Sequence, residues 1–379
     1  MIYKTIEELT TVVTGGTPST SKAEYWENGN IPWLQSGCCQ NCDVNQADKF
    51  ISQSGYDNSS TQVMPVNTVM IALTGATAGK VGYLNIEACG NQSITGVFPC
   101  EELNPRFLFY FLISQRRKIL VDCVGGAQAH ISQGYVKKIK VPVYSKNLQE
   151  RIVNIMNICS KNIKHYEMIL KEYDELVKAR FVEMFGDPII NPYGFPVKKI
   201  DEVAVLNKGI TYSPDDISKE GIIVLRSGNI KGNAFDLEDI VRISKKISND
   251  KLVNENDILM CNRNGSVNLV GKVAKIPKLE EKMTFGTFMT IVRSEIFEYL
   301  FVFFQMNAFR EQIKFQTAVA INQISLPLLA SVKVPIPTNE LIKEFADFVE
   351  QVDKSREEVK KSLEKTQQLY DSLMQEYFG

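Results

Sequence analysis

One apolar pattern occurs twice in this chain of 379 residues, and it constrains the fold more than any other feature. Apolar side chains recur in steps of four and three from Leu148 to Met184, and again from Leu341 to Tyr377. That spacing puts them on one stripe of a helix, as along the seam of a coiled coil. Leu148 and Leu341 are 193 positions apart, and so are Met184 and Tyr377. The pattern therefore predicts two long helices of one design.

A helix of such length needs a partner. Residues 148–186 make 39 residues, which would span roughly 58 Å as a helix. The seam of so long a helix is buried by another helix rather than by an ordinary core. The second copy has an equal length and a matching pattern. We therefore expect the two helices to pack together as an antiparallel coiled coil within one molecule.

The rest of the chain is repeated as well. Ile324-Ser325 in the second half corresponds to Ile131-Ser132 in the first, and residues 333–335 correspond to 140–142, both at an offset of 193 positions. Further upstream the offset drifts between 191 and 194, which places insertions and deletions in the upstream loops. We expect an α+β fold with a pseudo-twofold internal repeat. Its predicted parts are a mixed α/β domain at 1–147, a long helix at 148–186, a second mixed α/β domain at 187–340 and a second long helix at 341–379.

Bulk composition excludes some classes of protein. The net charge is −1, so any surface for nucleic acid must be a local patch. The eight cysteines are scattered and no secretory signal precedes them, which indicates reduced thiols in a cytoplasmic protein. The longest apolar run, 107–113, is too short to cross a bilayer, so no membrane partner is expected.

Motifs for catalysis are incomplete. Residues 191–194 read Asn-Pro-Tyr-Gly and lack the second proline of a methyltransferase motif. Residues 75–80 have too few residues between their glycines for a phosphate-binding loop, and Val81 stands where serine or threonine is needed. Cys39 and Cys42 have the spacing of half a zinc site without a second pair. We expect a chain that is not itself an enzyme and binds no metal or cofactor.

Several stretches together resemble a known family, the specificity subunit of type I restriction-modification systems. The resemblance covers the whole chain, and the stretches that carry it are 15–20, 24–26, 31–37, 74–82, 129–133 and 140–143, with 263–266, 271–272 and 285–289 in the second half. The sequence departs from the family at Cys38-Cys39, where Asp-Ile is common, and at 144–147, where a proline-rich exit is usual. Both departures fall in predicted loops and change local surface.

The resemblance implies a function. It implies two target recognition domains, each reading one half of a split site in double-stranded DNA, held apart by the helices. It also implies two methyltransferase (modification) subunits docked on the helices, with restriction and translocase subunits attached through them. S-adenosylmethionine, ATP and magnesium are then implied only for the partner subunits. A pseudo-twofold reader also suits half-sites about one helical turn apart.

Candidate DNA-binding residues lie in polar loops of both mixed domains. They are Thr17, Ser19, Lys22, Tyr25, Trp26, Thr74, Thr77, Lys80, Gln128, His130, Gln133, Tyr212, Arg226, Asn262, Arg263, Asn264, Ser266, Lys272, Asn322 and Gln323. Arginine can read guanine with two hydrogen bonds, and side-chain amides suit adenine. Each group has a structural alternative: Trp26 can cover the domain edge, 264–265 can be a hairpin turn, and the amides can cap the strand that follows.

Two other functions compete with DNA reading. One is a coiled-coil adaptor whose two lobes bind protein, and the other is a self-contained DNA enzyme. The incomplete catalytic motifs count against the enzyme. A symmetric adaptor gains nothing from two unlike lobes, so the divergence of the repeats favours a DNA reader. Salt separates the two remaining functions, because binding to phosphates weakens steeply as salt rises.

Overall fold

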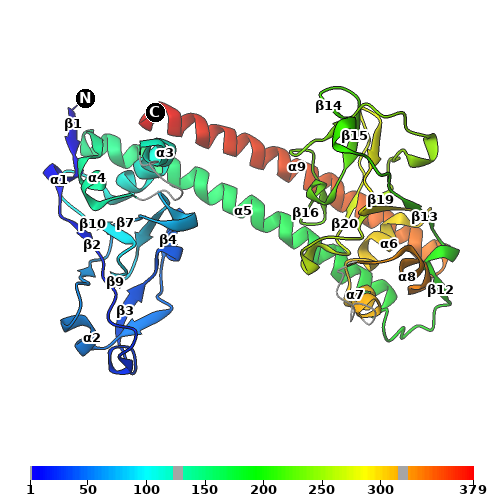
Figure 1. Cartoon of the computed structure of the whole chain (residues 1–379), viewed down its shortest axis with the longest axis horizontal. Coiled ribbons are helices and arrows are strands. Elements are labelled where there is room, and N and C mark those ends of the chain that lie inside the picture. The colour runs from blue at the N-terminus through cyan, green and yellow to red at the C-terminus, as the bar shows by residue number, and fades with distance from the viewer. Residues whose placement is uncertain (1, 123–130, 315–322) are drawn as a thin grey trace. The chain divides into compact units, whose positions relative to one another are not determined.

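The computed structural model describes residues 2–122, 131–314 and 323–379. The chain divides into two compact units. Unit 1 comprises Met1–Glu167 and Lys360–Gly379, and unit 2 comprises Met168–Val359. Each unit therefore contains one mixed domain and one part of each long helix (Figure 1).

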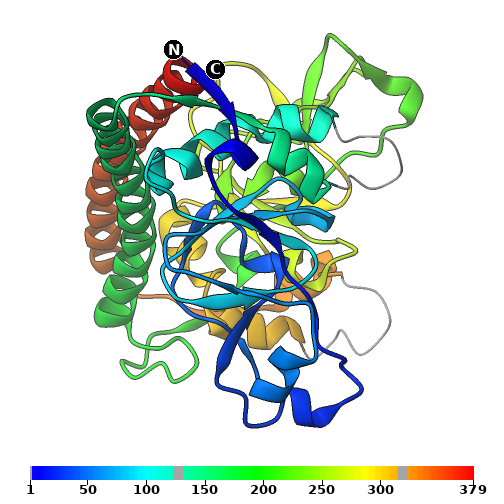
Figure 2. The same cartoon turned by 90° about the vertical axis from the view of Figure 1, so that its left-hand side faces the viewer.

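Two sheets of five and four strands make up most of the mixed domain of unit 1, whose ribbon runs from blue to cyan in Figure 2. The larger has the order β2 (Val12–Thr14), β10 (Ile94–Val97), β7 (Val69–Ala72), β8 (Val81–Leu84) and β4 (Cys42–Val44). The smaller has the order β5 (Lys49–Ile51), β3 (Ile31–Leu34), β9 (Ala88–Gly90) and β6 (Val63–Met64). All four residues of β7 are buried, as expected for a short apolar run in a central strand.

Short helices and one further strand pair complete this domain. They are β1 (Ile2–Thr5) paired with β11 (Lys140–Val143), and the helices α1 (Ile6–Leu9), α2 (Gln53–Asp57), α3 (Pro105–Asp122) and α4 (Gln133–Lys138). The proline-containing strand β11 pairs only with β1 among the described strands, consistent with an edge strand. Ser132 caps α4 by accepting a hydrogen bond from the Tyr135 amide at 3.1 Å.

Unit 2 repeats this arrangement. The sheet that corresponds to the larger sheet of unit 1 has the order β13 (Val205–Lys208), β22 (Met289–Arg293), β19 (Ile258–Cys261) and β20 (Val273–Lys275). A second sheet, also of four strands, has the order β14 (Ile217–Ser218), β18 (Arg242–Ile243), β15 (Ile222–Leu225) and β21 (Met283–Phe285). The pair β12 (Val197–Lys199) and β23 (Lys333–Pro335) corresponds to β1 and β11. Ser325 caps α8 (Leu326–Ser331) as Ser132 caps α4. The internal repeat read from the sequence is thus present in the backbone.

Two differences between the units matter below. The single helix α3 corresponds in unit 2 to α6 (Phe297–Phe303) and α7 (Asn307–Lys314), with an interruption at 304–306. Unit 2 also has a small hairpin, β16 (Ile230–Lys231) and β17 (Ala234–Phe235). The sheets that contain β7 and β19 also differ, with five strands in unit 1 and four in unit 2.

The repeated apolar pattern lies on α5 (Lys146–Phe185) and α9 (Asn339–Phe378), each of 40 residues. Helix α5 is followed by Gly186 in a left-handed conformation, a common helix terminator. In unit 2 the two helices run antiparallel, since Phe181 packs on Phe345 while Asp174, nearer the start of α5, pairs with Arg356, further along α9. In unit 1 the first part of α5 shares a core with the last part of α9.

The buried residues of the two helices differ in part from those that the periodicity predicts. Ile152 and Val352 on the predicted seam are buried, whereas Leu148 and Ile155, also on that seam, are each 37% exposed. Phe181, which is off the predicted stripe, is fully buried. The reason is that each helix also packs against its mixed domain, as Phe181 does against Tyr299 of α6 at 4.9 Å between ring centroids. The buried surface of each helix therefore includes residues that face its mixed domain as well as residues that face the other helix.

Candidate nucleic-acid interface

Equivalent loops connect the paired central strands of the two units. In unit 1 the first glycine loop, residues 73–79, joins β7 to β8. Its ends are fixed by hydrogen bonds from the Gly79 amide to the Ala72 carbonyl and from the Ala72 amide to the Lys80 carbonyl, both 2.9 Å. A third bond, from the Ile131 amide to the Leu73 carbonyl, is also 2.9 Å. Both ends of the loop are therefore held by backbone hydrogen bonds at the end of β7 and the start of β8.

In unit 2 the second glycine loop, residues 262–271, joins β19 to β20 with the same frame. The Gly271 amide donates to the Cys261 carbonyl at 2.7 Å, and the Cys261 amide to the Lys272 carbonyl at 2.9 Å. The Ile324 amide donates to the Asn262 carbonyl at 2.7 Å. The frame is the same, but the enclosed loop is longer and its residues are different.

Two further loops lie beside each glycine loop. In unit 1 the Leu73 amide donates to the Ser93 carbonyl at 2.9 Å, and Thr17 donates a hydrogen bond to the side chain of Gln92. In unit 2 the Asn262 amide donates to the Phe288 carbonyl at 2.9 Å, and the hydroxyl groups of Thr211 and Thr287 are 3.5 Å apart. Each unit thus brings three loops together at one end of the sheet that contains β7 in unit 1 and β19 in unit 2.

The glycine-rich turn at 15–16 passes very close to another backbone. The Gly16 amide donates to the Gly90 carbonyl at 2.9 Å, and a Cβ added to Gly15 would lie 2.0 Å from the Gly90 oxygen. Gly209 has the same relation to the Gly286 oxygen, also 2.0 Å. Glycine at these positions lets the backbones pass this closely, so that the loop carrying Thr17 reaches the segment that carries Gln92.

The candidates that follow this turn in unit 1 form a local cluster. Lys22 donates to the Tyr25 hydroxyl at 2.9 Å, which raises the pKa of the Lys22 ammonium group. Tyr25 is only 5% exposed. Trp26 donates to the Ser19 carbonyl at 3.2 Å and packs edge-on against Trp33. Ser19 and Lys22 therefore offer polar groups to solvent, whereas Tyr25 and Trp26 cover the domain edge.

The first glycine loop itself presents small polar groups. Thr74 and Thr77 are half-buried, and the intervening residues 75–76 are exposed. Lys80 donates to the side chain of Gln40 at 2.7 Å, which links the β7–β8 loop to the segment before β4. Gln133 donates to the Val12 carbonyl at 3.2 Å, and its side chain therefore helps to hold β2.

In unit 2 the candidates at 263 and 264 are brought together with two other loops. Arg263 is exposed, and its guanidinium carbon lies 5.1 Å from the centroid of the Phe288 ring. Phe288 is itself 51% exposed. Asn264 donates to the Ser227 hydroxyl at 3.0 Å. A cation held against an exposed ring has less freedom to lose on binding than a free side chain.

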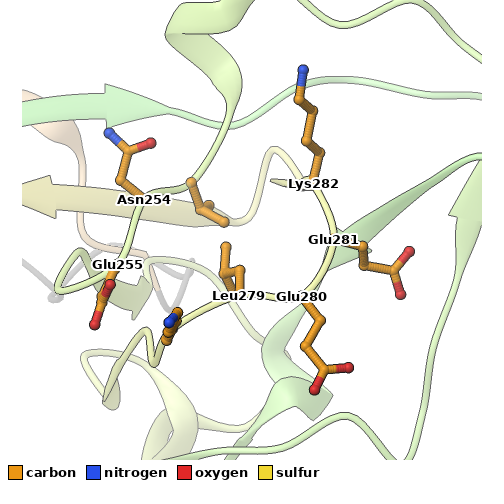
Figure 3. Close-up of a pocket in the computed structure, with 8 residues that line it drawn as sticks. Asn254, Glu255, Leu279, Glu280, Glu281 and Lys282 are labelled. Atoms are coloured by element: carbon orange, nitrogen blue, oxygen red, sulfur yellow. The ribbon is translucent and has the colours of Figure 1, made fainter.

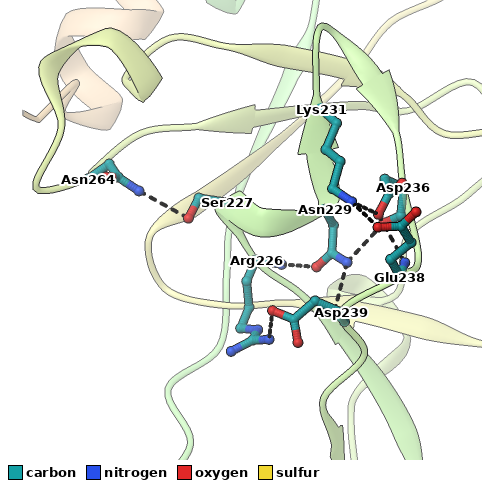
Figure 4. A network of polar contacts seen from close by, with 8 residues as sticks. All are labelled: Arg226, Ser227, Asn229, Lys231, Asp236, Glu238, Asp239 and Asn264. Carbon is teal, nitrogen blue, oxygen red and sulfur yellow. Dashed lines mark hydrogen bonds and ion pairs between the residues drawn. The ribbon is translucent and has the colours of Figure 1, made fainter. Parts of the chain in front are cut away.

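A polar network holds the loop after β15 (Figure 4). Asn229, only 1% exposed, accepts from the Arg226 amide at 2.8 Å and donates to the carbonyls of Asp236 and Asp239. The Arg226 guanidinium pairs with the Asp239 carboxylate at 2.7 Å. The charge of Arg226 is therefore already paired, and its side chain is not a free cation in this structure.

The remaining candidates are distributed as follows. Tyr212 is half-buried beside Gly286, Ser266 is exposed, and Lys272 is half-buried. Asn262 is 7% exposed and donates to the Thr290 hydroxyl at 2.9 Å, so it lies beneath the loop rather than at its surface. Gln323 forms an isolated bridge with Arg263. Gln128, His130 and Asn322 lie outside the described residues.

Some residues of these loops were not among the sequence candidates. Gln40, Gln92 and Ser227 each contact a candidate side chain or its neighbour, and Phe288 lies under Arg263. A signal existed only for Phe288, whose stretch 285–289 contributed to the resemblance. An apolar residue in such a stretch is ordinarily assigned to the core.

An open pocket of about 450 Å³ is lined by Val253, Asn254, Glu255, Lys278, Leu279, Glu280, Glu281 and Lys282 (Figure 3). Its three carboxylates disfavour a phosphate ligand. Within the described ranges, no group of three or more potential metal ligands comes together. No helix in the described part of the chain is both long and apolar enough to cross a membrane.

A family model places the chain. Residues 2–172 and 192–368 match the model described as the type I restriction modification DNA specificity domain. The chain belongs to this specificity family. The two matched segments correspond to the two copies of the internal repeat, so the resemblance seen in the sequence is confirmed.

Individual members of the specificity family share 20–31% of aligned residues with this chain in the two comparisons that follow. The EcoR124I/EcoR124II specificity subunit of Escherichia coli is 31% identical over 160 residues, which is 41% of this chain and 40% of that protein. The chain thus matches less than half the length of that relative. The MjaIX specificity subunit of Methanocaldococcus jannaschii is 20% identical, over 92% of this chain and 85% of that protein.

Solved structures share the fold. The S subunit of a type I restriction-modification system from M. genitalium has a TM-score of 0.57 at 16% identity, over 100% of this chain and 96% of that one. A chain from a study of complex assembly and conformational transition of the type I system has a TM-score of 0.55 at 13% identity, over 100% of this chain and 97% of that one. The mixed α/β fold in two parts is therefore shared with specificity subunits.

Proposed function

We propose that this chain is the DNA-binding specificity subunit of a type I restriction-modification complex, and that each mixed domain reads one half of a bipartite, asymmetric target. One observation carries the proposal. The frame that holds each glycine loop is the same in both units, whereas the loops it holds differ in length and chemistry. A shared frame with unlike loops is what two half-sites of different sequence require.

The two long helices form the second part of the proposal. We assign them to one continuous antiparallel coiled coil that sets the distance between the half-sites. Support comes from the helix pairing inside each unit, including the Asp174–Arg356 ion pair at 2.9 Å in unit 2. Half-sites on one face of a duplex are separated by whole helical turns, so a rigid spacer selects a fixed gap.

Partner subunits supply the chemistry in this proposal. Two methyltransferase subunits dock on the helices, and restriction and translocase subunits attach through them. Exposed apolar side chains on α5, such as Ile155 and Ile158 at 37% and 60% exposure, support a protein-docking face there. The chain itself is non-catalytic and binds no cofactor, and S-adenosylmethionine, ATP and magnesium belong to the partners. The assembly is cytoplasmic.

Exposed Arg263 provides the sharpest test. The full chain is incubated with a pool of double-stranded oligonucleotides carrying randomised bases, and bound duplexes are sequenced. We expect two conserved blocks separated by a gap of fixed length. Arg263→Ala should remove the preference at one position of one block, which corresponds to about 1–3 kcal/mol for a lost two-bond contact to a base. The other block should be unchanged.

A matched control lies at the other end of β20. Lys278 is exposed on the loop that follows β20, whereas Arg263 lies on the loop that precedes it. Lys278→Ala should leave both blocks intact. If no block is selected, or if the affinity for duplex DNA does not fall with salt, the chain is a protein-binding adaptor instead.

A further inference from the structure

Both glycine loops end in a glycine whose backbone is left-handed and whose open side is filled by an arginine. Gly79 has φ +72° and Gly271 has φ +76°. A Cβ added to Gly79 would lie 3.1 Å from Arg116 Cγ, and one added to Gly271 would lie 2.8 Å from Arg310 Nη1. Each loop therefore closes directly against an arginine side chain from a helix of its own unit.

The arginines also donate hydrogen bonds to the loop backbone. Arg116 Nε donates to the Ala78 carbonyl at 3.2 Å. Arg310 donates from Nη1 to the Val270 carbonyl at 2.6 Å and from Nη2 to the Gly271 carbonyl at 3.1 Å. Ala78 and Val270 each precede the left-handed glycine, so the two arginines engage equivalent carbonyl groups.

The two arginines contact equivalent carbonyl groups although they do not occupy equivalent positions in the sequence repeat. Gly79 and Gly271 are 192 positions apart, whereas Arg116 and Arg310 are 194 apart. The interruption between α6 and α7 accounts for the change of register. At the constant offset of 193 positions, Arg310 would instead correspond to Arg117, which is exposed. Two different helix geometries thus bring an arginine to the same carbonyl.

The chemistry of the contact suits a support. A guanidinium group is always charged and presents its donors in a rigid fork, so it can hold two carbonyl oxygens at once. Burial lowers the pKa of Arg310 from its ordinary value. The carbonyl oxygens of Val270 and Gly271 accept hydrogen bonds from its guanidinium group. A positive charge therefore lies against a loop that we propose binds DNA, which is anionic.

We propose that Arg116 and Arg310 are positioning residues that hold the first and second glycine loops in the shape that reads DNA. The loop shape is a property of the chain alone, whereas the reading role rests on the proposed function above. In this arrangement the arginines contact the loop backbone and the loop side chains contact the bases. Sequence preference can then change by loop substitution while the support stays the same.

Hydrogen exchange of the full chain without DNA tests the support. Arg116→Lys keeps the charge but removes the planar guanidinium group whose Nε donates to the Ala78 carbonyl. We expect amides of residues 73–80 to exchange at least about tenfold faster, since local opening becomes easier. Arg117→Lys, one position along the same helix, is the matched control and should leave them unchanged. Arg310→Lys should accelerate exchange in residues 262–272 only.

Equal protection of the loop in Arg116→Lys and in the wild type would overturn the support role. If a lysine variant fails to keep the wild-type circular dichroism, Arg116→Gln and Arg310→Gln are measured in its place with the same expectation. Faster exchange throughout the unit, rather than in the loop alone, would also contradict a positioning role.

Selection from the same randomised duplex pool tests the reading role. Arg116→Lys should weaken base preference in one block, and Arg310→Lys in the other, each by about tenfold. A loss in both blocks from either variant, or in neither, overturns the assignment. A wild-type chain that selects no block contradicts the proposed function and the reading role together, while the exchange measurement still decides whether the arginines hold the loops.

Discussion

The guanidinium carbon of Arg106 lies 3.5 Å from the centroid of the Tyr83 ring, and this contact joins α3 to β8 in unit 1. The positions 192 residues further on hold Glu298 and Lys275, which join α6 to β20 in unit 2 through an ion pair of 2.9 Å. A cation over a ring has thus been replaced by two opposite charges at the same junction. The junction is kept, and its chemistry is not.

Removing the lysine of this junction should destabilise the chain. The side chains of Lys275 and Glu298 are 25% and 12% exposed, and Lys275 also pairs with Asp353 of α9 at 2.8 Å. Lys275→Ala leaves the buried Glu298 carboxylate without its cation, while Asp353 keeps Arg356 at 3.8 Å, and the cost is about 3 kcal/mol at neutral pH. Urea unfolding followed by circular dichroism measures this cost. The double variant Lys275→Met/Glu298→Leu should recover most of it, and no recovery would contradict an electrostatic cause.

The cost of Lys275→Ala should depend on pH. Burial raises the pKa of Glu298, and the neighbouring Lys275 counteracts that rise. Without the lysine the pKa of Glu298 in the folded state should rise further above its unfolded value. A raised carboxyl pKa gives stability that is present at low pH and lost as pH rises through the folded pKa. The deficit of the variant should therefore shrink as pH falls from 7 towards 4.5. A deficit that is constant or grows on acidification would count against this account.

Tyr110 provides a test in unit 1 at alkaline pH. Its hydroxyl donates to Asn157 on α5 at 2.7 Å, and burial raises its pKa to about 12. The favourable contribution of the neutral phenol is complete below pH 10 and is lost as pH rises towards about 12. Tyr110→Phe should cost about 1 kcal/mol at neutral pH, the net worth of one hydrogen bond. It should also flatten the loss of stability above pH 10.

Tryptophan emission is a suitable measurement for this variant. Both tryptophans of the chain, Trp26 and Trp33, lie in unit 1 with Tyr110. Urea midpoints from emission at pH 7 and pH 11 give the two free energies of unfolding. Burial raises the pKa of Tyr370 as well, so some alkaline loss should remain in Tyr110→Phe. If the free energy of unfolding falls by the same amount between pH 7 and pH 11 in Tyr110→Phe and in the wild type, Tyr110 does not contribute to the alkaline loss of stability.

Much of the fold could be predicted because it depends on local apolar patterning. The helices α5 and α9 follow from steps of four and three, and β7 follows from a short apolar run. The internal repeat was visible as a nearly constant offset. These features need no knowledge of distant contacts. The burial of Phe181 was not predictable in the same way, because it packs against Tyr299 from a different part of the chain.

The candidate site was predicted at the level of loops and less well at the level of residues. Tyr25 and Asn262 are polar residues in the expected loops, yet both are buried. Phe288 is apolar and yet exposed, because the segment that carries it crosses the sheet edge beside Arg263. A constant offset matches Arg310 with Arg117, whereas the structure places Arg116 at the equivalent carbonyl. Side-chain exposure in loops depends on backbone geometry that no periodicity encodes.

The close crossing at Gly15 gives a last prediction, on the support of the recognition loops. A methyl group at position 15 would collide with the backbone at Gly90 rather than with a flexible side chain, so the strands must separate. Gly15→Ala should therefore cost about 3 kcal/mol or more, at the upper end of overpacking effects. Trp33, whose ring nitrogen donates to the Gly16 carbonyl at 2.9 Å, should report the change as a red shift of its emission.

Two variants make this prediction specific. Gly37→Ala, where an added Cβ meets nothing within 4 Å, should leave stability and emission near the wild type. Gly209→Ala creates the corresponding collision with Gly286 in unit 2, where the chain has no tryptophan. It should lower stability by circular dichroism without altering native tryptophan emission. Equal emission shifts in Gly15→Ala and Gly209→Ala would mean that the collision does not act through the local crossing, because only the first crossing is joined to Trp33.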